Sequence, residues 1–272
     1  MLENPAAVQQ KDKVRDTFDA RSSSWQAGYS ESDNFRNYNF LVRRRCVLEM
    51  LLSDKSAGRF LDAGCGSGDY LPALLERNLD VWCMDAAGGM VRKVRERFQG
   101  VSALHISEGD VEKMDYPDEF FDGVLCAGVL EYLSDDDRAL SEIGRVLKKG
   151  GAAVLTVPNK LSPFMMLDVS VYWTLRFLGS VLERLGIFRI FLGRERLNRT
   201  SQHNHYVPSS FNSKLGEHGL RVVDFSYCSF GSFAVSQSIP FSVAFSKFFE
   251  RFRRNRVLGL LGLNYIVKVV KR

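Results

Sequence analysis

The sequence predicts an α/β fold in which helices cover a doubly wound parallel sheet. Between residues 59 and 159, short apolar runs alternate with amphipathic stretches, the pattern of consecutive β–α units. A glycine-rich stretch, Gly64–Gly68, follows the first of these runs and precedes a helical stretch. At 272 residues, the chain is long enough for one substantial domain with a small insertion.

The apolar and amphipathic runs assign the elements in order. We expect strands at 59–63, 80–85, 103–106, 123–127 and 152–157, with helices at 69–77, 89–98 and 134–147. Ser134 is predicted to cap the last of these helices, because three acids follow it and two lysines end the helix. Further along, we expect helices at 209–219 and 241–256 and strands at 221–227 and 264–270.

Charge divides the chain into two halves. Residues 1–159 hold 20 Lys and Arg against 26 Asp and Glu, whereas residues 160–272 hold 17 against 6, so the balances are −6 and +11. A basic second half favours an anionic partner such as a phosphorylated substrate, an acidic lipid surface or nucleic acid, or it is a solvated face without a partner. Nucleic acid is disfavoured because no recognised binding module accompanies the basic residues.

Cysteines and apolar stretches bear on the compartment. The five cysteines are scattered without paired spacing, which argues against a disulfide framework or a zinc site and favours a reducing compartment. The first residues, Met-Leu-Glu-Asn-Pro, do not read as a secretory signal. Residues 164–192 are strongly apolar, but charged residues interrupt them every seven or eight positions, so we do not expect a membrane span. The expected location is cytoplasmic, with the alternative of peripheral attachment to the inner membrane face.

The strongest local signal is the stretch 61–68, Leu-Asp-Ala-Gly-Cys-Gly-Ser-Gly. Glycines in a strand–helix turn let a ligand lie against bare backbone, which suits any nucleotide. A dinucleotide fingerprint spaces its glycines as Gly-x-Gly-x-x-Gly, whereas Gly64, Gly66 and Gly68 alternate here. Asp62 also lies within the loop, and an acid suits a cationic ligand better than a pyrophosphate.

Two further acids follow predicted strands. Asp85 ends the second strand, 17 residues after Gly68, where a carboxylate accepts hydrogen bonds from ribose hydroxyls. Gly109-Asp110-Val111 comes just after the third strand. There the carboxylate of Asp110 can accept a proton from an adenine amine, while the neighbouring amide serves a ring nitrogen.

With these motifs, the chain resembles the class I S-adenosylmethionine (SAM) dependent methyltransferases, especially the ubiquinone/menaquinone-biosynthesis-like, type 11 subgroup. The resemblance implies SAM as cofactor, with Gly64 and Gly66 along the methionine moiety, Asp85 at the ribose and Asp110 at the adenine. Members of the family often have His where this chain has Tyr132. The full set of expected cofactor-binding residues is Asp62, Gly64, Cys65, Gly66, Asp85, Ala86, Met90, Asp110, Val111, Cys126 and Tyr29.

The resemblance also implies an architecture. It is a Rossmann-like seven-stranded sheet with the last strand antiparallel and an inserted helical cap. We expect an N-terminal helical lid at 1–58, the SAM-binding core at 59–159, the inserted acceptor cap at 160–208, and the rest of the sheet with a basic, Phe-rich helical insertion at 209–272. Tyr29 or Tyr38 would cover the methionine end of SAM, or else pack in a helix against the sheet.

The acceptor side offers two histidines, His203 and His205, which precede the helix expected at 209–219. They are candidates for a general base or an acceptor contact, with a structural role and a metal pair as alternatives. His105 and His218 are expected to be structural. The apolar stretch of the cap and the basic, Phe-rich segment have three possible roles. They would line an apolar acceptor pocket, bind an anionic bilayer, or pack against each other as a cap.

These expectations add up to a methyltransferase that moves a methyl group onto a small, lipophilic or lipid-linked acceptor, with oxygen preferred as the methylated atom. Two alternatives remain: an NAD(P)-dependent oxidoreductase, which the glycine spacing disfavours, and a non-catalytic SAM-binding scaffold associated with a membrane. Methyl transfer from a sulfonium needs alignment and exclusion of water more than any obligatory side chain.

Overall fold

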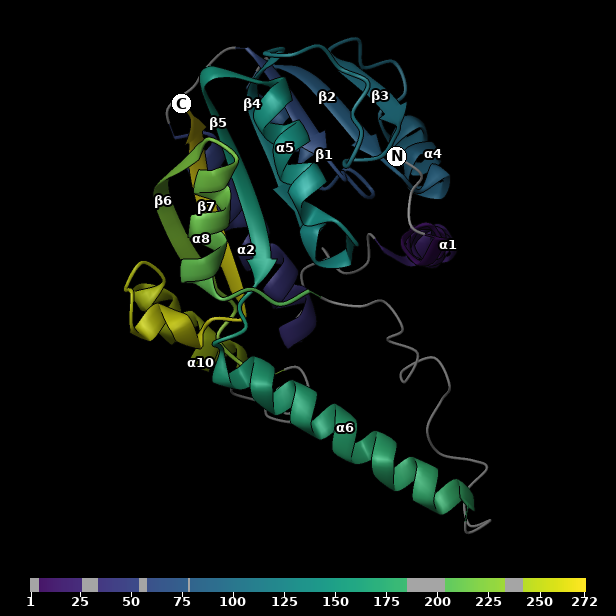
Figure 1. Cartoon of the computed structure of the whole chain (residues 1–272), viewed down its shortest axis with the longest axis vertical. Coiled ribbons are helices and arrows are strands. Elements are labelled where there is room, and N and C mark those ends of the chain that lie inside the picture. Colours follow the sequence, from purple (N-terminus) through teal and green to yellow (C-terminus); the bar gives the residue numbers. More distant parts are fainter. Residues whose placement is uncertain (1–4, 26–33, 54–57, 78, 185–203, 233–241) are drawn as a thin grey trace.

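A seven-stranded sheet forms the centre of the protein, seen in a computed structural model that describes residues 5–25, 34–53, 58–77, 79–184, 204–232 and 242–272 (Figure 1). The strand order is β3-β2-β1-β4-β5-β7-β6, and β7 runs antiparallel to both of its neighbours. This confirms the α/β fold with an antiparallel last strand. The strands are β1 Arg59–Ala63, β2 Asp80–Asp85, β3 Leu104–Glu108, β4 Phe121–Ala127, β5 Leu147–Pro158, β6 Leu220–Cys228 and β7 Asn264–Lys271.

Helices cover both faces of the sheet and bury one apolar cluster on each. On one face lie α2 (Phe35–Leu51), α3 (Leu71–Leu75) and α4 (Gly88–Arg97), which pack side chains such as Val47 onto the strands. On the other face lie α5 (Asp136–Val146) and α8 (Pro208–Glu217), with Ile143 and Leu215 fully buried. Figure 1 shows α5 and α8 in front of the sheet and α2 behind it.

The direction of winding reverses at β1. Successive strands run from β1 to β2 and β3 on one side, while β4 pairs with β1 on the other. Ligands of open α/β sheets bind where the strand order reverses, outside the carboxyl ends of the strands. The ends of β1 and β4, at Ala63 and Ala127, therefore mark the place to look for a site.

Several helix limits differ from the sequence-based prediction. Asp135, not Ser134, caps α5, because its side chain accepts the amide proton of Arg138. α8 begins at Pro208 without a side-chain cap, because its N-cap residue, Val207, has no hydrogen-bond acceptor on its side chain.

The basic, Phe-rich helix is also shorter than predicted. α10 spans only Ser242–Phe249, and a 3-10 turn, η3 (Glu250–Phe252), follows it. The chain turns there because Glu250 accepts the amide proton of Ser229, and the carbonyl of Arg253 accepts that of Tyr227.

The N-terminal region expected to form a lid contains two different helices. α1 (Pro5–Trp25) lies against α4, whereas α2 belongs to the layer that covers the sheet. Tyr38 on α2 packs against the buried cluster of that layer, in line with the packing alternative. Tyr29 falls outside the described residues.

The inserted cap begins with a long helix, α6 (Pro163–Arg184), that extends away from the body (Figure 1). Asp168, on its first half, is buried and accepts a hydrogen bond from Ser232. The remainder of the expected cap, residues 185–203, lies outside the described residues. Within the described part of the chain, no helix is long and apolar enough to cross a membrane.

The packing of β1 against β4 depends on a missing side chain. A Cβ atom on Gly123 would come 2.3 Å from the ring of Phe60, which is buried on the neighbouring strand. Gly123→Ala should lower the free energy of unfolding by about 1–3 kcal/mol, the usual cost of overpacking a core. Urea denaturation measures the difference.

Gly216→Ala is the matched control, because a Cβ atom there meets open space on α8. Alanine in a helix is preferred over glycine by about 0.5–1 kcal/mol, so this variant should gain stability. Equal effects of the two substitutions would contradict the close approach of Phe60.

Candidate functional site

The turn after β1 is folded by hydrogen bonds to the end of β2. The amides of Gly64 and Cys65 both donate to the carbonyl of Met84, at 2.8 and 2.9 Å, and the amide of Gly66 donates to the carboxylate of Asp85 at 2.8 Å. Gly64 has φ +79°, and a Cβ atom there would come 2.3 Å from Val129. The turn therefore requires glycine, and it presents bare backbone at the reversal point of the sheet.

Asp85 holds this turn through hydrogen bonds to both of its carboxylate oxygens. One carboxylate oxygen accepts the amide proton of Gly66 and the other accepts that of Ala87 at 2.9 Å. Burial raises the pKa of Asp85, and the two amides act in the opposite direction. Each oxygen still has a second lone pair, so the carboxylate can accept two further hydrogen bonds from a ligand.

Asp62 lies beneath the same turn and is almost fully buried. Its Oδ2 atom has no hydrogen-bond partner. Burial, with smaller contributions from the negative charges of Asp85 and Asp69, raises the pKa of Asp62 to about 8. A buried carboxyl with an unsatisfied oxygen is a place where a cationic ligand group is stabilised.

Asp110 follows β3 and already holds a cation from the N-terminal helix. Its Oδ2 atom forms an ion pair with Lys11 on α1 at 2.8 Å, and Lys11 also reaches Glu112 at 2.8 Å. The second oxygen of Asp110 accepts the amide proton of Glu112. Asp110, which was expected to bind an adenine, is therefore held by an ion pair with α1.

Two more contacts hold α1 across the strand ends. The carboxylate of Asp19 accepts the amide proton of Gly89 at the start of α4, at 2.5 Å. The ring of Phe18 packs edge-on against Tyr132, with 5.0 Å between the centroids. Together with Lys11, these residues connect α1 to the ends of β2, β3 and β4. Tyr132, which departs from the usual histidine, serves here as a packing surface for α1.

The other predicted cofactor residues surround the turn. Met90 and Cys126 are fully buried, Cys65 and Val111 nearly so, and Ala86 is exposed beside Asp85. Burial raises the pKa of the Cys126 thiol, which disfavours a nucleophilic thiolate. Their contact with a cofactor stays a prediction.

On the acceptor side, His205 lies between two anchored residues. Asn204 donates its amide proton to the carbonyl of Glu131 and its side-chain amide to that of Leu133, both at 2.8 Å. The hydroxyl of Tyr206 lies within hydrogen-bond distance of the carboxylate of Asp136, at 2.9 Å, and of the carbonyl of Leu130, at 3.1 Å. These bonds place His205 beside η2 (Leu130–Tyr132), directly after β4. His203 lies outside the described residues.

Glu131 is a site residue that the sequence prediction missed. Its side chain is buried beside the carboxyl end of β4, and Oε2 has no hydrogen-bond partner. Burial raises the pKa of Glu131 to about 7, while the charge of Arg43 on α2 lowers it. Glu131 stands directly before Tyr132, the position at which the family often has histidine, and this was the signal available in the sequence.

The remaining histidines have structural surroundings. His105 stacks on Trp82 with 4.1 Å between ring centroids and bonds to Asp80, whereas His218 bonds to Ser141 and Asp137. Among the residues that the structure describes, no group of three or more His, Cys, Asp or Glu side chains is arranged to hold a metal ion.

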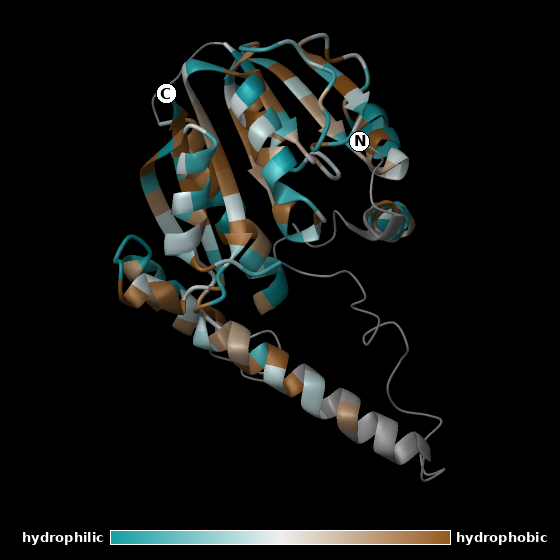
Figure 2. Cartoon of the chain, in the orientation of Figure 1, coloured by the Kyte–Doolittle hydropathy of each residue, from teal (hydrophilic) through white to brown (hydrophobic). Residues whose placement is uncertain are grey.

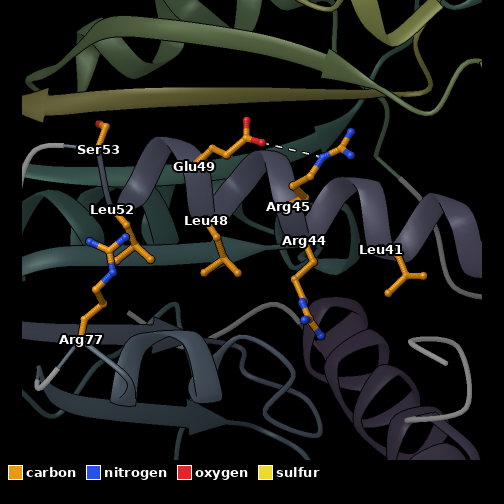
Figure 3. A pocket seen from close by; sticks show the side chains of 8 residues that line it. All are labelled: Leu41, Arg44, Arg45, Leu48, Glu49, Leu52, Ser53 and Arg77. Carbon is orange, nitrogen blue, oxygen red and sulfur yellow. Dashed lines mark ion pairs between the residues drawn. The ribbon is translucent and has the colours of Figure 1, made fainter. Parts of the chain in front are cut away.

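A groove of about 540 Å³ runs along the outer face of α2 (Figure 3). Figure 3 shows Arg44 and Arg77 on either side of Leu48, whereas Arg45 points to the other side of α2, where it pairs with Glu49. None of the predicted cofactor residues lines this groove. We assign the site to the strand ends because the turn, the buried acids and the reversal of winding coincide there.

Comparison with known proteins supports this assignment. A family described as "Methyltransferase domain" matches residues 61–155, the span from β1 to β5. The ubiquinone/menaquinone biosynthesis C-methyltransferase UbiE of Bordetella avium is 38% identical over 97 residues, which cover 34% of this chain and 38% of that protein. A demethylmenaquinone methyltransferase of Symbiobacterium thermophilum is 25% identical over 82% of this chain and 88% of its own length.

Solved structures agree on the fold. Magnesium protoporphyrin IX methyltransferase from Synechocystis, determined with bound S-adenosylhomocysteine (SAH), superposes with a TM-score of 0.62 at 16% identity, covering 96% of this chain and all of that one. Residues 61–155 are a class I SAM-dependent methyltransferase domain. The chain spans under half the length of the first curated relatives that it matches, 38% and 48%.

SAM is the cofactor of this class, and the methyltransferase domain has groups that suit it. The glycine turn leaves room where a side chain would otherwise meet Val129. Asp62 offers an unsatisfied buried oxygen to a cation, and Asp85 offers acceptors to hydroxyls. The donor and acceptor chemistry at the strand ends therefore fits a nucleoside that carries a positive charge.

Asp62→Asn should stabilise the ligand-free methyltransferase domain at pH 8. The folded protein retains a proton on Asp62 that the unfolded chain releases near pH 4, so this carboxyl costs more stability as pH rises from about 4 to about 8. Removing the charge should raise the free energy of unfolding by about 2 kcal/mol or more at pH 8, and by much less near pH 4.5.

Urea denaturation at the two pH values measures the effect, with Asp115→Asn, an exposed acid, as the control. A gain for Asp62→Asn that is the same at both pH values would rule out a buried carboxyl as its cause.

Proposed function

We propose that the protein transfers the methyl group of SAM to a small, lipophilic or lipid-linked acceptor. The observation that carries the proposal is the glycine turn after β1. Asp85 accepts a hydrogen bond from this turn, and next to it lies the buried Oδ2 atom of Asp62, which has no hydrogen-bond partner. In this assignment, Gly64 and Gly66 lie along the methionine moiety, Asp62 faces its ammonium group and Asp85 accepts from the ribose. When bound, SAM supplies a methyl group already activated on a sulfonium.

α1 completes the binding site in this proposal. Lys11 holds the carboxylates of Asp110 and Glu112, and Asp19 holds the start of α4. Helix α1 would thereby cover the nucleoside side of the proposed site and exclude water, which an in-line methyl displacement requires.

His205 is the proposed general base. It lies after β5 beside η2, and its neighbours Asn204 and Tyr206 are anchored to that turn. A hydroxyl acceptor must lose a proton as the methyl group arrives, and a neutral imidazole within hydrogen-bond reach accepts it. We propose oxygen as the methylated atom, which requires an acceptor hydroxyl beside His205.

The acceptor class rests on the similar proteins and on the apolar insertion. Two relatives named above are, by their names, methyltransferases of ubiquinone/menaquinone biosynthesis and of demethylmenaquinone. A rice relative that is 33% identical over 102 residues is a methyltransferase of a phytyl hydroquinone. In this chain, α6 begins five residues after β5 with Phe164, Met165 and Met166. Apolar side chains next to the carboxyl ends of the strands suit an acceptor with a hydrocarbon tail.

SAM and SAH should each raise the melting temperature of the protein, because a ligand that binds only the folded state stabilises it by mass action. NAD should not. Asp85→Ala should weaken SAM binding by about 1–3 kcal/mol, the scale of charge-assisted hydrogen bonds left unmade. Isothermal titration calorimetry gives both affinities.

Asp80→Ala removes an acid from the other end of the same strand and should leave SAM affinity unchanged. Because Asp85 also holds Gly66, a second variant, Asp85→Asn, keeps an acceptor for one amide while it removes the charge. If both Asp85 variants fold and bind SAM as the wild type does, the ribose assignment is wrong.

His205→Ala should reduce turnover about 100-fold or more while SAM affinity stays the same, as expected for loss of a general base. The acidic limb of the pH–rate profile should disappear with it. His218→Ala, at the C-cap of α8 and away from the carboxyl ends of the strands, is the control and should keep full turnover. Normal turnover and an unchanged pH profile in His205→Ala would leave this histidine with a structural role.

A further inference from the structure

One face of α6 is apolar and exposed to solvent. Met166, Val169, Trp173 and Phe177 are 53%, 41%, 60% and 67% exposed, and their spacing of three or four residues puts them in one stripe along the helix. We call these four residues the α6 stripe. Figure 2 shows brown segments along α6 where it leaves the body.

The stripe faces away from the body because the opposite side of α6 contacts the rest of the protein. Asp168 lies about half a helical turn around from the stripe, is buried and accepts a hydrogen bond from Ser232. Phe164, near the start of α6, packs edge-on against Phe245 of α10 at 6.0 Å. The contacts that orient α6 thus lie on the side opposite to these four exposed apolar side chains.

A basic, aromatic segment adjoins the base of α6. We call Ser242–Leu261, from α10 through η3 to η4 (Leu258–Leu261), the basic segment. Apart from the neutral Asn255, its exposed residues are either apolar or cationic, and its single acid, Glu250, is buried. The exposed members are Ala244, Phe245, Lys247, Phe248, Arg251, Arg254, Asn255, Arg256, Val257 and Leu258.

The cations of the basic segment differ in whether they form ion pairs with acids elsewhere in the protein. Arg253 is paired with Glu49 at 2.8 Å and Arg254 with Asp224 at 3.2 Å, so each of these two arginines already has an acidic partner in the body of the protein. Arg251 instead lies over the exposed ring of Phe248, 5.0 Å from its centroid. Lys247 is also exposed, one helical position before Phe248.

We propose that the α6 stripe and the basic segment dock the protein on an anionic lipid surface. Tryptophan and phenylalanine enter the interface between headgroups and acyl chains, and cations beside them meet lipid phosphates. The absence of an exposed acid in the basic segment removes repulsion from such a surface. A second copy of the chain would carry the same positive charge against itself, which favours lipid as the occupant.

The docking surface lies at the carboxyl ends of the strands, because α6 follows β5 directly. A lipid-embedded acceptor would therefore approach the same edge of the sheet as the glycine turn. The docking does not depend on the proposed methyl transfer and is measured without it.

Vesicle flotation tests the proposal with full-length protein and two compositions, phosphatidylcholine alone and equal parts of phosphatidylcholine and phosphatidylglycerol. The wild type should float with the anionic vesicles at about 0.02 M salt and largely leave them at about 0.5 M, where charge is screened. Binding to phosphatidylcholine alone should be at least about tenfold weaker.

Two double variants separate the contributions. Lys247→Glu with Arg251→Glu should reduce binding to anionic vesicles about tenfold or more. Trp173→Ser with Phe177→Ser should reduce it comparably and make the remainder more sensitive to salt. Lys149→Glu with Arg221→Glu changes the charge equally at the opposite end of the sheet and should bind as the wild type does.

All three variants should keep the thermal shift with SAM if the proposed function holds, so a failure of docking is distinguishable from a failure of cofactor binding. The docking proposal is overturned if the wild type ignores anionic vesicles at low salt, or if the control loses binding as strongly as the other variants. It is also overturned if light scattering shows a dimer that the stripe variant alone dissociates.

Discussion

Three backbone amides at the end of β1 determine the rest of the site. The amides of Gly64 and Cys65 donate to Met84, and that of Gly66 donates to Asp85, so the turn is fixed to the end of β2. The turn exists only because glycine tolerates φ +79° and the close approach of Val129. Every other site residue is positioned relative to it, since β1 is also the strand at which the winding reverses.

The site concentrates buried acidic side chains where the protein provides few cations. Asp62 and Glu131 are buried with raised pKa values, and each has an oxygen without a hydrogen-bond partner. Such groups cost stability in the ligand-free protein and are retained at functional sites, where a bound charge offsets the cost. A cation beside Asp62 would favour its ionised form, so cofactor binding near neutral pH should be coupled to release of a proton.

Sequence reasoning found the parts of this arrangement that depend on local pattern. The strands, the glycine turn and Asp85 follow from periodicity and spacing along 100 residues of chain. The missed parts are long-range contacts. Lys11 forms an ion pair with Asp110, 99 residues away, and Asp19 accepts a hydrogen bond from Gly89, 70 residues away. The sequence near these residues therefore does not indicate the pairing.

The same reason explains the elements that were misplaced. The helix expected at 241–256 ends at Phe249 because Glu250 turns inward to Ser229, 21 residues earlier. α2 reads as part of a lid, yet it packs on the sheet beside β5, β6 and β7, two of which come more than 160 residues later. Helical periodicity alone does not distinguish a lid from a helix that covers a sheet.

The central claim is that the strand ends bring SAM to a lipophilic acceptor. Incubation of the protein with SAM labelled on its methyl group, in parallel with a lipid extract and with a polar-metabolite extract, tests it most directly. The account predicts that label passes into an organic-soluble product in the lipid extract and that this depends on Asp85. Label in polar products alone would contradict the proposed acceptor class. If the protein binds SAM but labels neither extract, methyl transfer to the lipids or metabolites of these extracts is contradicted.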